Sequence, residues 1–109
     1  MSDYQPGDIV LIAFPFSDGA GSKRRPALVI RDTGDDDVIV ARVTSQSSAS
    51  VFDVELAGWQ QAGLLLPSIV RVHKLATLEK HLVERRLGLL TMEDRALVRA
   101  KLRELLARM

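Results

Sequence analysis

Residues 9–14 read IVLIAF, a short β-branched run that follows Pro6-Gly7-Asp8 and ends at Pro15. A continuous apolar run of this length, bounded by turn-forming residues, predicts a β-strand that is buried on both faces. We therefore interpret it as the first strand of a domain that is mainly β.

Four further segments have the pattern of short strands. They are residues 27–31 (ALVIR), 38–44 (VIVARVT), 51–56 (VFDVEL) and 69–75 (IVRVHKL). The acidic turn at 34–37 (GDDD) joins the first two into a hairpin-like pair, and Pro26 stands at the first residue of its strand, where proline is tolerated. The alternation of apolar and polar residues in 51–56 predicts a strand with one solvated face.

The connections contain glycine and small polar residues. Residues 17–22 (SDGAGS) predict a mobile loop, which leads into the basic loop Lys23-Arg24-Arg25-Pro26. Residues 57–63 predict a turn or a short helical piece, and the single tryptophan there, Trp59, is interpreted as a packing or dimer-contact residue. The acidic turn is interpreted as solvated rather than as a cation site, because three consecutive aspartates at a hairpin tip point in different directions.

The period of the apolar residues changes near the end of the chain. Thr91, with Asp94 three positions later, has the form of a helix N-cap and its acidic partner. The apolar residues that then share one helical face are Leu97, Val98, Leu102, Leu105 and Leu106. Several short strands without βαβ alternation, followed by one helix, predict a mainly β fold with a C-terminal helix, built as a small curled antiparallel barrel.

The composition narrows the class of protein. The chain has 109 residues, 47% of them hydrophobic, which suits a single domain spanning 1–109. It has no cysteine, so disulfides and thiolate metal sites are impossible and a reducing compartment is expected. There is no basic leader with an apolar run, and no apolar stretch approaches the roughly 20 residues of a membrane span. We expect a cytoplasmic protein without membrane contact.

The net charge of +1 conceals a segregation of charge. The first 70 residues contain five Lys/Arg against nine Asp/Glu, whereas the remaining 39 contain ten against five. Binding of nucleic acid through charge would require the few N-terminal cations to gather on one surface, so charge alone is weak support for such a partner.

Several kinds of catalytic site receive no support from residue spacing. The only histidines, His73 and His81, are eight residues apart, and no acidic metal cluster accompanies them. Gly19 and Gly21 lack the strand-loop-helix context of a phosphate-binding loop, and no Gly-x-Ser-x-Gly sequence is present. We therefore expect no metal and no other cofactor.

A set of cationic and hydroxyl side chains remains. Its members are Arg24 and Arg25 at the start of a strand, Thr44 and Ser45 at the end of the strand expected beside it, and Arg71, His73 and Lys74 on a later strand. Arginine presents a planar fork of donors that suits phosphate oxygens, and threonine adds a neutral donor. Together they could hold the transition state of RNA cleavage without a metal. The alternative is that they are solubilising cations at strand ends.

The motifs match a known family at this point. Gly7-Asp8-Ile9-Val10, residues 21–30 (GSKRRPALVI), Val43-Thr44-Ser45, residues 67–71 (PSIVR) and Leu87-Gly88 resemble, in order and spacing, the MazF/PemK toxins of bacterial type II toxin-antitoxin systems. The resemblance covers the chain from Gly7 to the C-terminal helix.

The resemblance implies a fold, partners and a reaction. The fold is an SH3-like barrel with a C-terminal helix, and the partners are a second copy of the chain, single-stranded RNA bound along the homodimer interface, and a cognate antitoxin protein. The reaction is sequence-selective, metal-independent cleavage of mRNA to 2′,3′-cyclic phosphate and 5′-hydroxyl ends, which inhibits translation and growth. The arginine before the proline and the threonine that closes the later strand are the family's catalytic pair, which map here onto Arg25 and Thr44.

The resemblance also suggests secondary site residues. Some relatives use an acidic residue two positions after the strand arginine as the base, and this chain has His73 there, which could take that part or contact phosphate. Candidates for RNA contacts are Arg24, Ser45, Gln46, Arg71 and Lys74.

Two alternatives to RNA cleavage stay open. One is a non-enzymatic toxin of the same fold that poisons DNA gyrase; such relatives have a C-terminal Trp-Gly-Ile, whereas this chain ends Leu105-Leu106-Ala107-Arg108-Met109, which counts against it. The other is a catalytically silent RNA-binding barrel.

Overall fold

The computed structural model describes residues 3–15, 22–47 and 49–109. In chain order, the elements are β1 (Asp8–Pro15), β2 (Ser22–Asp32), β3 (Asp37–Thr44), β4 (Asp53–Glu55), β5 (Ile69–Glu79), the 3-10 turn η1 (Lys80–Leu82), β6 (Val83–Leu89) and α1 (Met92–Leu106). The strands form one sheet in the order β4-β5-β3-β2-β1-β6, and each neighbouring pair is antiparallel. Most of the predicted loop at 17–22 lies outside the described residues, and its last residue, Ser22, begins β2.

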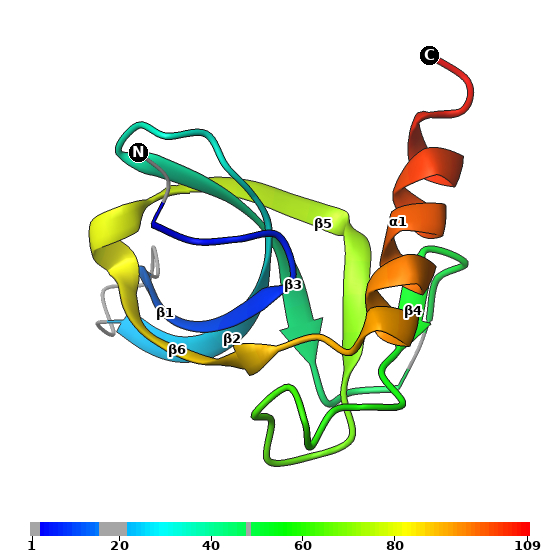
Figure 1. The fold of residues 1–109 in the computed structure, drawn as a ribbon, viewed down its shortest axis with the longest axis horizontal. Coiled ribbons are helices and arrows are strands. Elements are labelled where there is room, and N and C mark those ends of the chain that lie inside the picture. The colour runs from blue at the N-terminus through cyan, green and yellow to red at the C-terminus, as the bar shows by residue number, and fades with distance from the viewer. Residues whose placement is uncertain (1–2, 16–21, 48) are drawn as a thin grey trace.

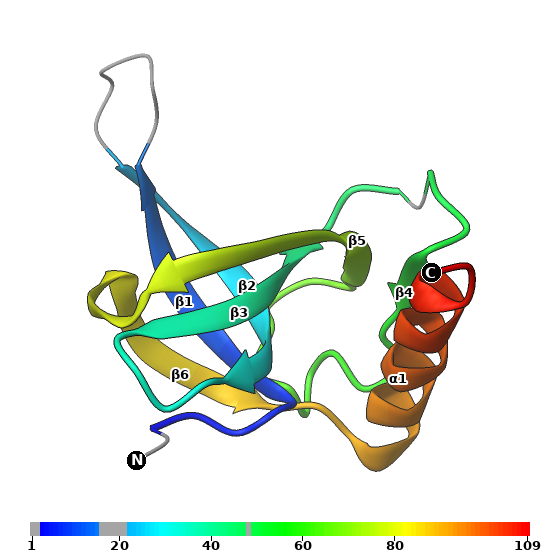
Figure 2. The ribbon, with the colours of Figure 1, turned by 90° about the horizontal axis from the view of Figure 1, so that it is seen from above.

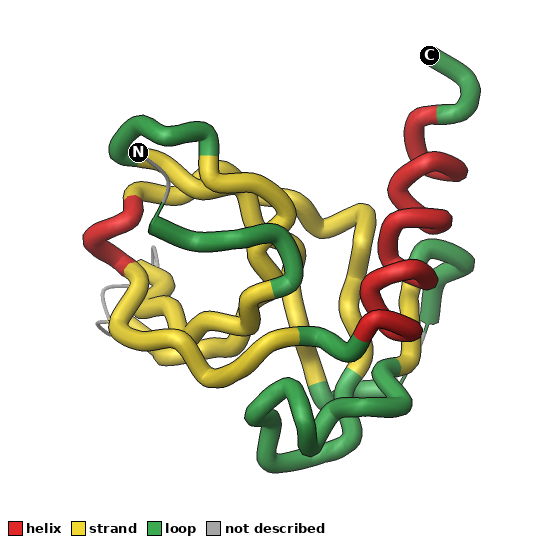
Figure 3. Tube along the Cα trace, in the orientation of Figure 1, coloured by secondary structure: helices red, strands yellow, loops and turns green. Residues whose placement is uncertain are grey.

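The sheet is strongly curled. Figure 1 shows the strands rolled into a ring with α1 beside it, and Figure 2 shows the same arrangement from above. Figure 3 sets the helical segments apart from the strands and the long connections. Because α1 packs beside β4 and β5, the helix covers one side of the barrel. The predicted fold class, a curled antiparallel barrel with a C-terminal helix, is confirmed.

β1 contributes to two separate groups of buried side chains. Ile9 belongs to a group that also includes Val98 of α1, whereas Val10 and Ile12 belong to a second group. Successive side chains of a strand point to opposite faces, so a continuous apolar run can fill both groups at once. The predicted strand is confirmed, and Ile9, Val10 and Ile12 are buried as expected, whereas Leu11 and Ala13 are only partly buried.

The basic segment is a strand, which corrects the prediction of a basic loop. Lys23, Arg24 and Arg25 lie in β2 and pair with Phe14, Ala13 and Ile12 of β1. The sequence pattern predicts Pro26 at the first residue of its strand. The structure instead places it inside β2. Pairing of β2 with β3 begins only at Ala27, so one side of β2 is unpaired at the proline. A residue without an N–H is tolerated at such a position.

Other boundaries also differ from the predicted ones. β4 is only three residues long, because Val51 and Phe52 lie in a turn. β5 continues beyond residue 75 to Glu79, and β6 is a strand to which the sequence pattern assigned no boundaries. The register between β3 and β5 jumps from Arg71 to Leu75, and this irregularity accounts for the sharp bend of β5 in Figure 1.

The start of α1 agrees with the predicted cap. Thr91 is the N-cap, and its hydroxyl accepts a hydrogen bond of 3.2 Å from the Asp94 amide. Of the predicted apolar face, Val98 is buried and Leu102 and Leu105 pack against the core. Leu97 and Leu106 are instead exposed, because the helix touches the barrel along a narrower face than the pattern predicted.

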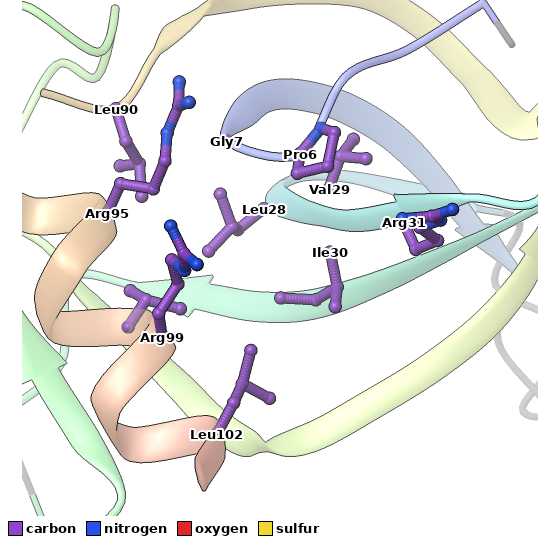
Figure 4. Close-up of a pocket in the computed structure, with 11 residues that line it drawn as sticks. Pro6, Gly7, Leu28, Val29, Ile30, Arg31, Leu90, Arg95, Arg99 and Leu102 are labelled. Carbon is purple, nitrogen blue, oxygen red and sulfur yellow. The ribbon is translucent and has the colours of Figure 1, made fainter. Parts of the chain in front are cut away.

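A hollow of about 360 Å³ lies between α1 and β2 (Figure 4). Leu28 and Ile30 of β2 face Leu102 of the helix across it, and Arg95 and Arg99 project from the helix at its edge. None of the sequence-predicted site residues lines this hollow.

The N-terminal segment is fastened to the barrel by Asp32. Its buried carboxylate accepts hydrogen bonds from the amides of Asp3 and Tyr4, at 2.7 and 3.0 Å, and pairs with Lys80 at 2.8 Å. The Lys80 ammonium holds the pKa of Asp32 well below its usual range, and the Asp32 carboxylate raises the pKa of Lys80. Three distant segments of the chain therefore meet at one charge pair.

Candidate functional site

The register of the β2–β3 hairpin brings Arg25 and Thr44 together. Ala27 pairs with Arg42, and continuing the same register by two residues places Arg25 opposite Thr44. The two strands stop pairing before this point, so both side chains lie where the hairpin opens. Backbone pairing between β2 and β3 has ended here, so the Arg25 guanidinium and the Thr44 hydroxyl face a common space.

This space is a cavity of about 420 Å³. Its charged and hydroxyl-bearing lining residues are Arg25, Thr44, Ser45, Ser68 and Arg85, and its remaining lining residues are Leu11, Pro26, Val43, Gly63, Leu64, Leu65, Leu66 and Leu87. The polar set contains two guanidinium groups and no carboxylate. The cavity is therefore suited to an anionic group rather than to a cation.

Thr44 keeps a donor available for a ligand. Its Oγ1 accepts a hydrogen bond of 3.2 Å from the Gln46 amide. Since a hydroxyl has one proton and two lone pairs, this bond fixes the oxygen and leaves the O–H free to donate. Ser68, by contrast, donates its proton to the Leu66 carbonyl at 2.8 Å and shapes the connection instead.

Residues 63–66 and Ser68 form part of the cavity lining, and two glycines allow this segment to approach β6. Gly63 has φ +85°, and a Cβ there would overlap the Leu87 carbonyl oxygen. A Cβ on Gly88 would overlap the Ala62 carbonyl oxygen in the same way. Only residues without side chains permit this backbone contact, which brings Leu64, Leu65 and Leu66 to the cavity.

A second contact holds the same connection from the helix side. The buried carboxylate of Asp94 accepts hydrogen bonds from the amides of Ala57 and Gly58, at 3.2 and 2.8 Å. The predicted acidic partner of the Thr91 cap thus bonds to a distant turn. Residues 57–63 form turns, which is one of the two predicted forms. Trp59 packs against the core.

Three of the sequence-predicted site residues line the cavity, namely Arg25, Thr44 and Ser45. Arg24 instead pairs through Nε with Glu84 of β6, and Arg71 pairs with the buried carboxylate of Asp53 at 3.4 Å. Each of these two arginines therefore already has a carboxylate partner in the chain. Gln46 and Lys74 are exposed and lie outside the cavity lining.

His73 also lies outside the cavity lining. It occupies the irregular stretch of β5 between Arg71 and Leu75, and its ring centroid is 6.2 Å from that of Phe52. Its Nδ1 is buried and has no hydrogen-bond partner among the described residues. The structure therefore does not bring His73 to Arg25 and Thr44, and its part in catalysis stays a prediction.

Arg85 is the cavity residue that the sequence pattern missed. It belongs to β6, whose sequence VERRLGL has consecutive charges and no clean alternation. The available signal was the motif Leu87-Gly88, which marks the same strand but says nothing of a site residue. Only the pairing of β6 with β1, which sets Arg85 beside Leu11, brings it to the cavity.

Neither a metal cluster nor a membrane span occurs in the described part of the chain. No three His, Asp or Glu side chains in residues 3–15, 22–47 and 49–109 gather closely enough to hold a metal ion. Among the same residues, no helix is sufficiently long and apolar to cross a membrane.

The fold and the cavity define a small β-barrel protein whose site offers guanidinium and hydroxyl donors to an anion. Residues 5–106 match the family described as the PemK-like, MazF-like toxin of type II toxin-antitoxin systems, and the chain belongs to this family. The resemblance inferred from the motifs is confirmed. Among curated protein sequences, none matches the chain.

Solved structures share the fold at low sequence identity. MazE–MazF from Deinococcus radiodurans is 24% identical with a TM-score of 0.78, over 97% of this chain and 98% of that one. An endoribonuclease from Mycobacterial species, in complex with its cognate antitoxin, is 18% identical with a TM-score of 0.76, over 97% of each chain. MazF from Deinococcus radiodurans is 27% identical with a TM-score of 0.67, over 96% of this chain and 99% of that one.

Proposed function

We propose that this toxin is a metal-independent, sequence-selective endoribonuclease that cleaves single-stranded mRNA and so inhibits translation and growth. The observation that carries the proposal is that Arg25 and Thr44 line the same anion-suited cavity. The description of a similar solved structure as an endoribonuclease supports it.

The proposed reaction is an attack of the ribose 2′-oxygen on the adjacent phosphorus. The new O2′–P bond forms as the P–O5′ bond breaks, the 2′-hydroxyl loses its proton, and the departing O5′ gains one. The products are a 2′,3′-cyclic phosphate and a 5′-hydroxyl. Negative charge grows on the non-bridging oxygens in between, and preorganised donors that meet this charge lower the barrier.

Arg25 and Thr44 are the donors for this charge. The guanidinium of Arg25 stays protonated at any physiological pH, so its part is electrostatic stabilisation of the phosphoryl oxygens rather than removal of a proton. Thr44 donates its free O–H to the same group. The family pattern offers His73 as a proton acceptor or a phosphate contact, but its position outside the cavity lining supports neither role.

The proposed assembly follows that of similar proteins. Both a MazE–MazF structure and a mycobacterial endoribonuclease have been solved with an antitoxin. We include in the proposal a cognate antitoxin, a homodimer as the active form, and a cytoplasmic location where mRNA is available.

The test is cleavage of a long single-stranded RNA in EDTA by the wild-type protein and by Arg25→Ala. We expect cleavage by the wild type and a loss of about 10³-fold or more in the variant. Arg31→Ala, an exposed arginine of β2 outside the cavity, is the matched control and should retain the wild-type rate. Full activity of Arg25→Ala would overturn the proposal. So would a wild-type protein that binds the RNA but does not cleave it, or one that inhibits DNA gyrase supercoiling without cleaving RNA.

A further inference from the structure

The three charged residues at the start of β6 have different surroundings. Glu84 pairs with Arg24 of β2, and Arg86 pairs with the buried carboxylate of Asp8 at 3.0 Å. Arg85, between them, has no ion pair or hydrogen bond with any of the described residues and is exposed. The fold therefore uses the two outer charges and leaves the middle guanidinium available.

Arg85 lies across one strand from the Arg25 segment. Leu11 of β1 pairs with Pro26 on one side and with Arg85 on the other, and all three residues line the same cavity. Neighbouring strands are about 4.8 Å apart, so the backbones of Pro26 and Arg85 are separated by about 10 Å. The strand segments that carry Arg25 and Arg85 therefore lie on either side of the strand that carries Leu11.

Charge balance strengthens the case for a ligand at Arg85. Arg24, which does not line the cavity, is paired with Glu84. Arg25 and Arg85 line the cavity, and neither has a carboxylate partner among the described residues. A polyanion that enters with one phosphate at Arg25 carries further phosphates along its strand. The second unpaired guanidinium suits one of these.

We propose that Arg85 is an RNA-contact residue, which binds a phosphate next to the scissile one while Arg25 and Thr44 act on the scissile phosphate. This inference rests on the proposed RNA substrate. Because the Arg85 contact forms equally in the bound substrate and in the transition state, its loss weakens binding and leaves the chemical step unchanged.

The test is the salt dependence of binding to a fluorescein-labelled single-stranded RNA that is 2′-O-methylated at every ribose, and so lacks the attacking hydroxyl. Removal of one phosphate contact on a single strand lowers the slope of log K against log salt by about 0.7. We expect Arg85→Ala to show this change, together with about tenfold weaker binding at low salt. On unmodified RNA its KM should rise while kcat stays at the wild-type value.

Two variants complete the design. Arg85→Lys keeps the charge but not the planar fork, so it should recover the wild-type slope with intermediate affinity. Arg99→Ala removes the same charge from α1, beside the hollow between α1 and β2 and outside the cavity lining, and should leave the slope unchanged.

The outcomes separate this inference from the proposed function. Wild-type slopes in both Arg85→Ala and Arg99→Ala would overturn the Arg85 contact while RNA cleavage by the wild type stands. Equal slope losses in both alanine variants would also overturn it, because they would show a general charge effect. A lower salt slope in Arg85→Ala alone, together with no cleavage of unmodified RNA by the wild type, would support the contact and overturn the proposed enzyme activity.

Discussion

Arg25 and Thr44 each lie two residues beyond Ala27 and Arg42, the last paired residues of β2 and β3, and both line the same cavity. The pairing that precedes this point fixes both backbones, since Ala27, Ala41 and Leu28 are all fully or almost fully buried. The donors of the proposed site are thus held by core residues of a sheet rather than by a loop.

Replacement of Thr44 tests the hydroxyl separately from the strand. Thr44→Val preserves the β-branched shape but removes the O–H, and we expect the rate of RNA cleavage to fall by about 10²–10³-fold. Thr44→Ser restores a hydroxyl at the same position and should recover most of the activity. Steady-state cleavage of a labelled RNA measures both, and a wild-type rate in Thr44→Val would remove Thr44 from the proposed mechanism.

Replacement of His73 tests the component that the geometry supports least. Because His73 lies outside the cavity, His73→Gln is expected to cleave within about threefold of the wild-type rate, whereas loss of a general base costs about 10²–10⁴-fold. Single-turnover rates across a pH series distinguish the two. A rate loss of about 10²–10⁴-fold would show that His73 acts on the substrate.

The glycine contact behind the cavity predicts a large difference between two similar substitutions. Gly63 and Gly34 both have φ +85°, but a Cβ on Gly34 meets nothing within 4 Å whereas one on Gly63 overlaps the Leu87 carbonyl. Gly34→Ala should therefore cost only the backbone strain, about 1–2 kcal/mol. Gly63→Ala should lower the free energy of unfolding by about 3 kcal/mol or more. Urea unfolding measures both, and equal losses would contradict the close contact.

The Asp32–Lys80 pair predicts a dependence of stability on acid. The pKa of Asp32 is lowered by Lys80, so its contribution to stability is fully present above the ordinary aspartate pKa of about 3.9 and is lost as the pH falls toward the lowered value. Asp32→Asn should unfold at a lower temperature than the wild type near pH 6, and the gap should narrow below about pH 4. A constant gap across this range would contradict the assignment.

The fold class follows largely from local patterns in the chain. Residues 9–14 and 38–44 have the composition of buried strands, and the turn at 34–37 predicts the hairpin. The alignment of Arg25 with Thr44 also depends on the register shift between Val29 and Arg31, which no local pattern predicts. Arg85 does not follow from any such pattern, because it reaches the cavity only through the pairing of β6 with β1. His73 follows Arg71 by two positions in the sequence, but the register jump between Arg71 and Leu75 interrupts the regular pairing of β5 at this point.

The carboxylate of Asp94 links the start of α1 to the turn that leads into the cavity wall. Neither segment can leave its native position without breaking bonds that the other needs, so the first helical turn and residues 57–58 form one cooperative unit of local opening. Native-state hydrogen exchange should therefore give the amides of Gly58 and Asp94 the same opening free energy, although they are separated by 36 positions in the sequence.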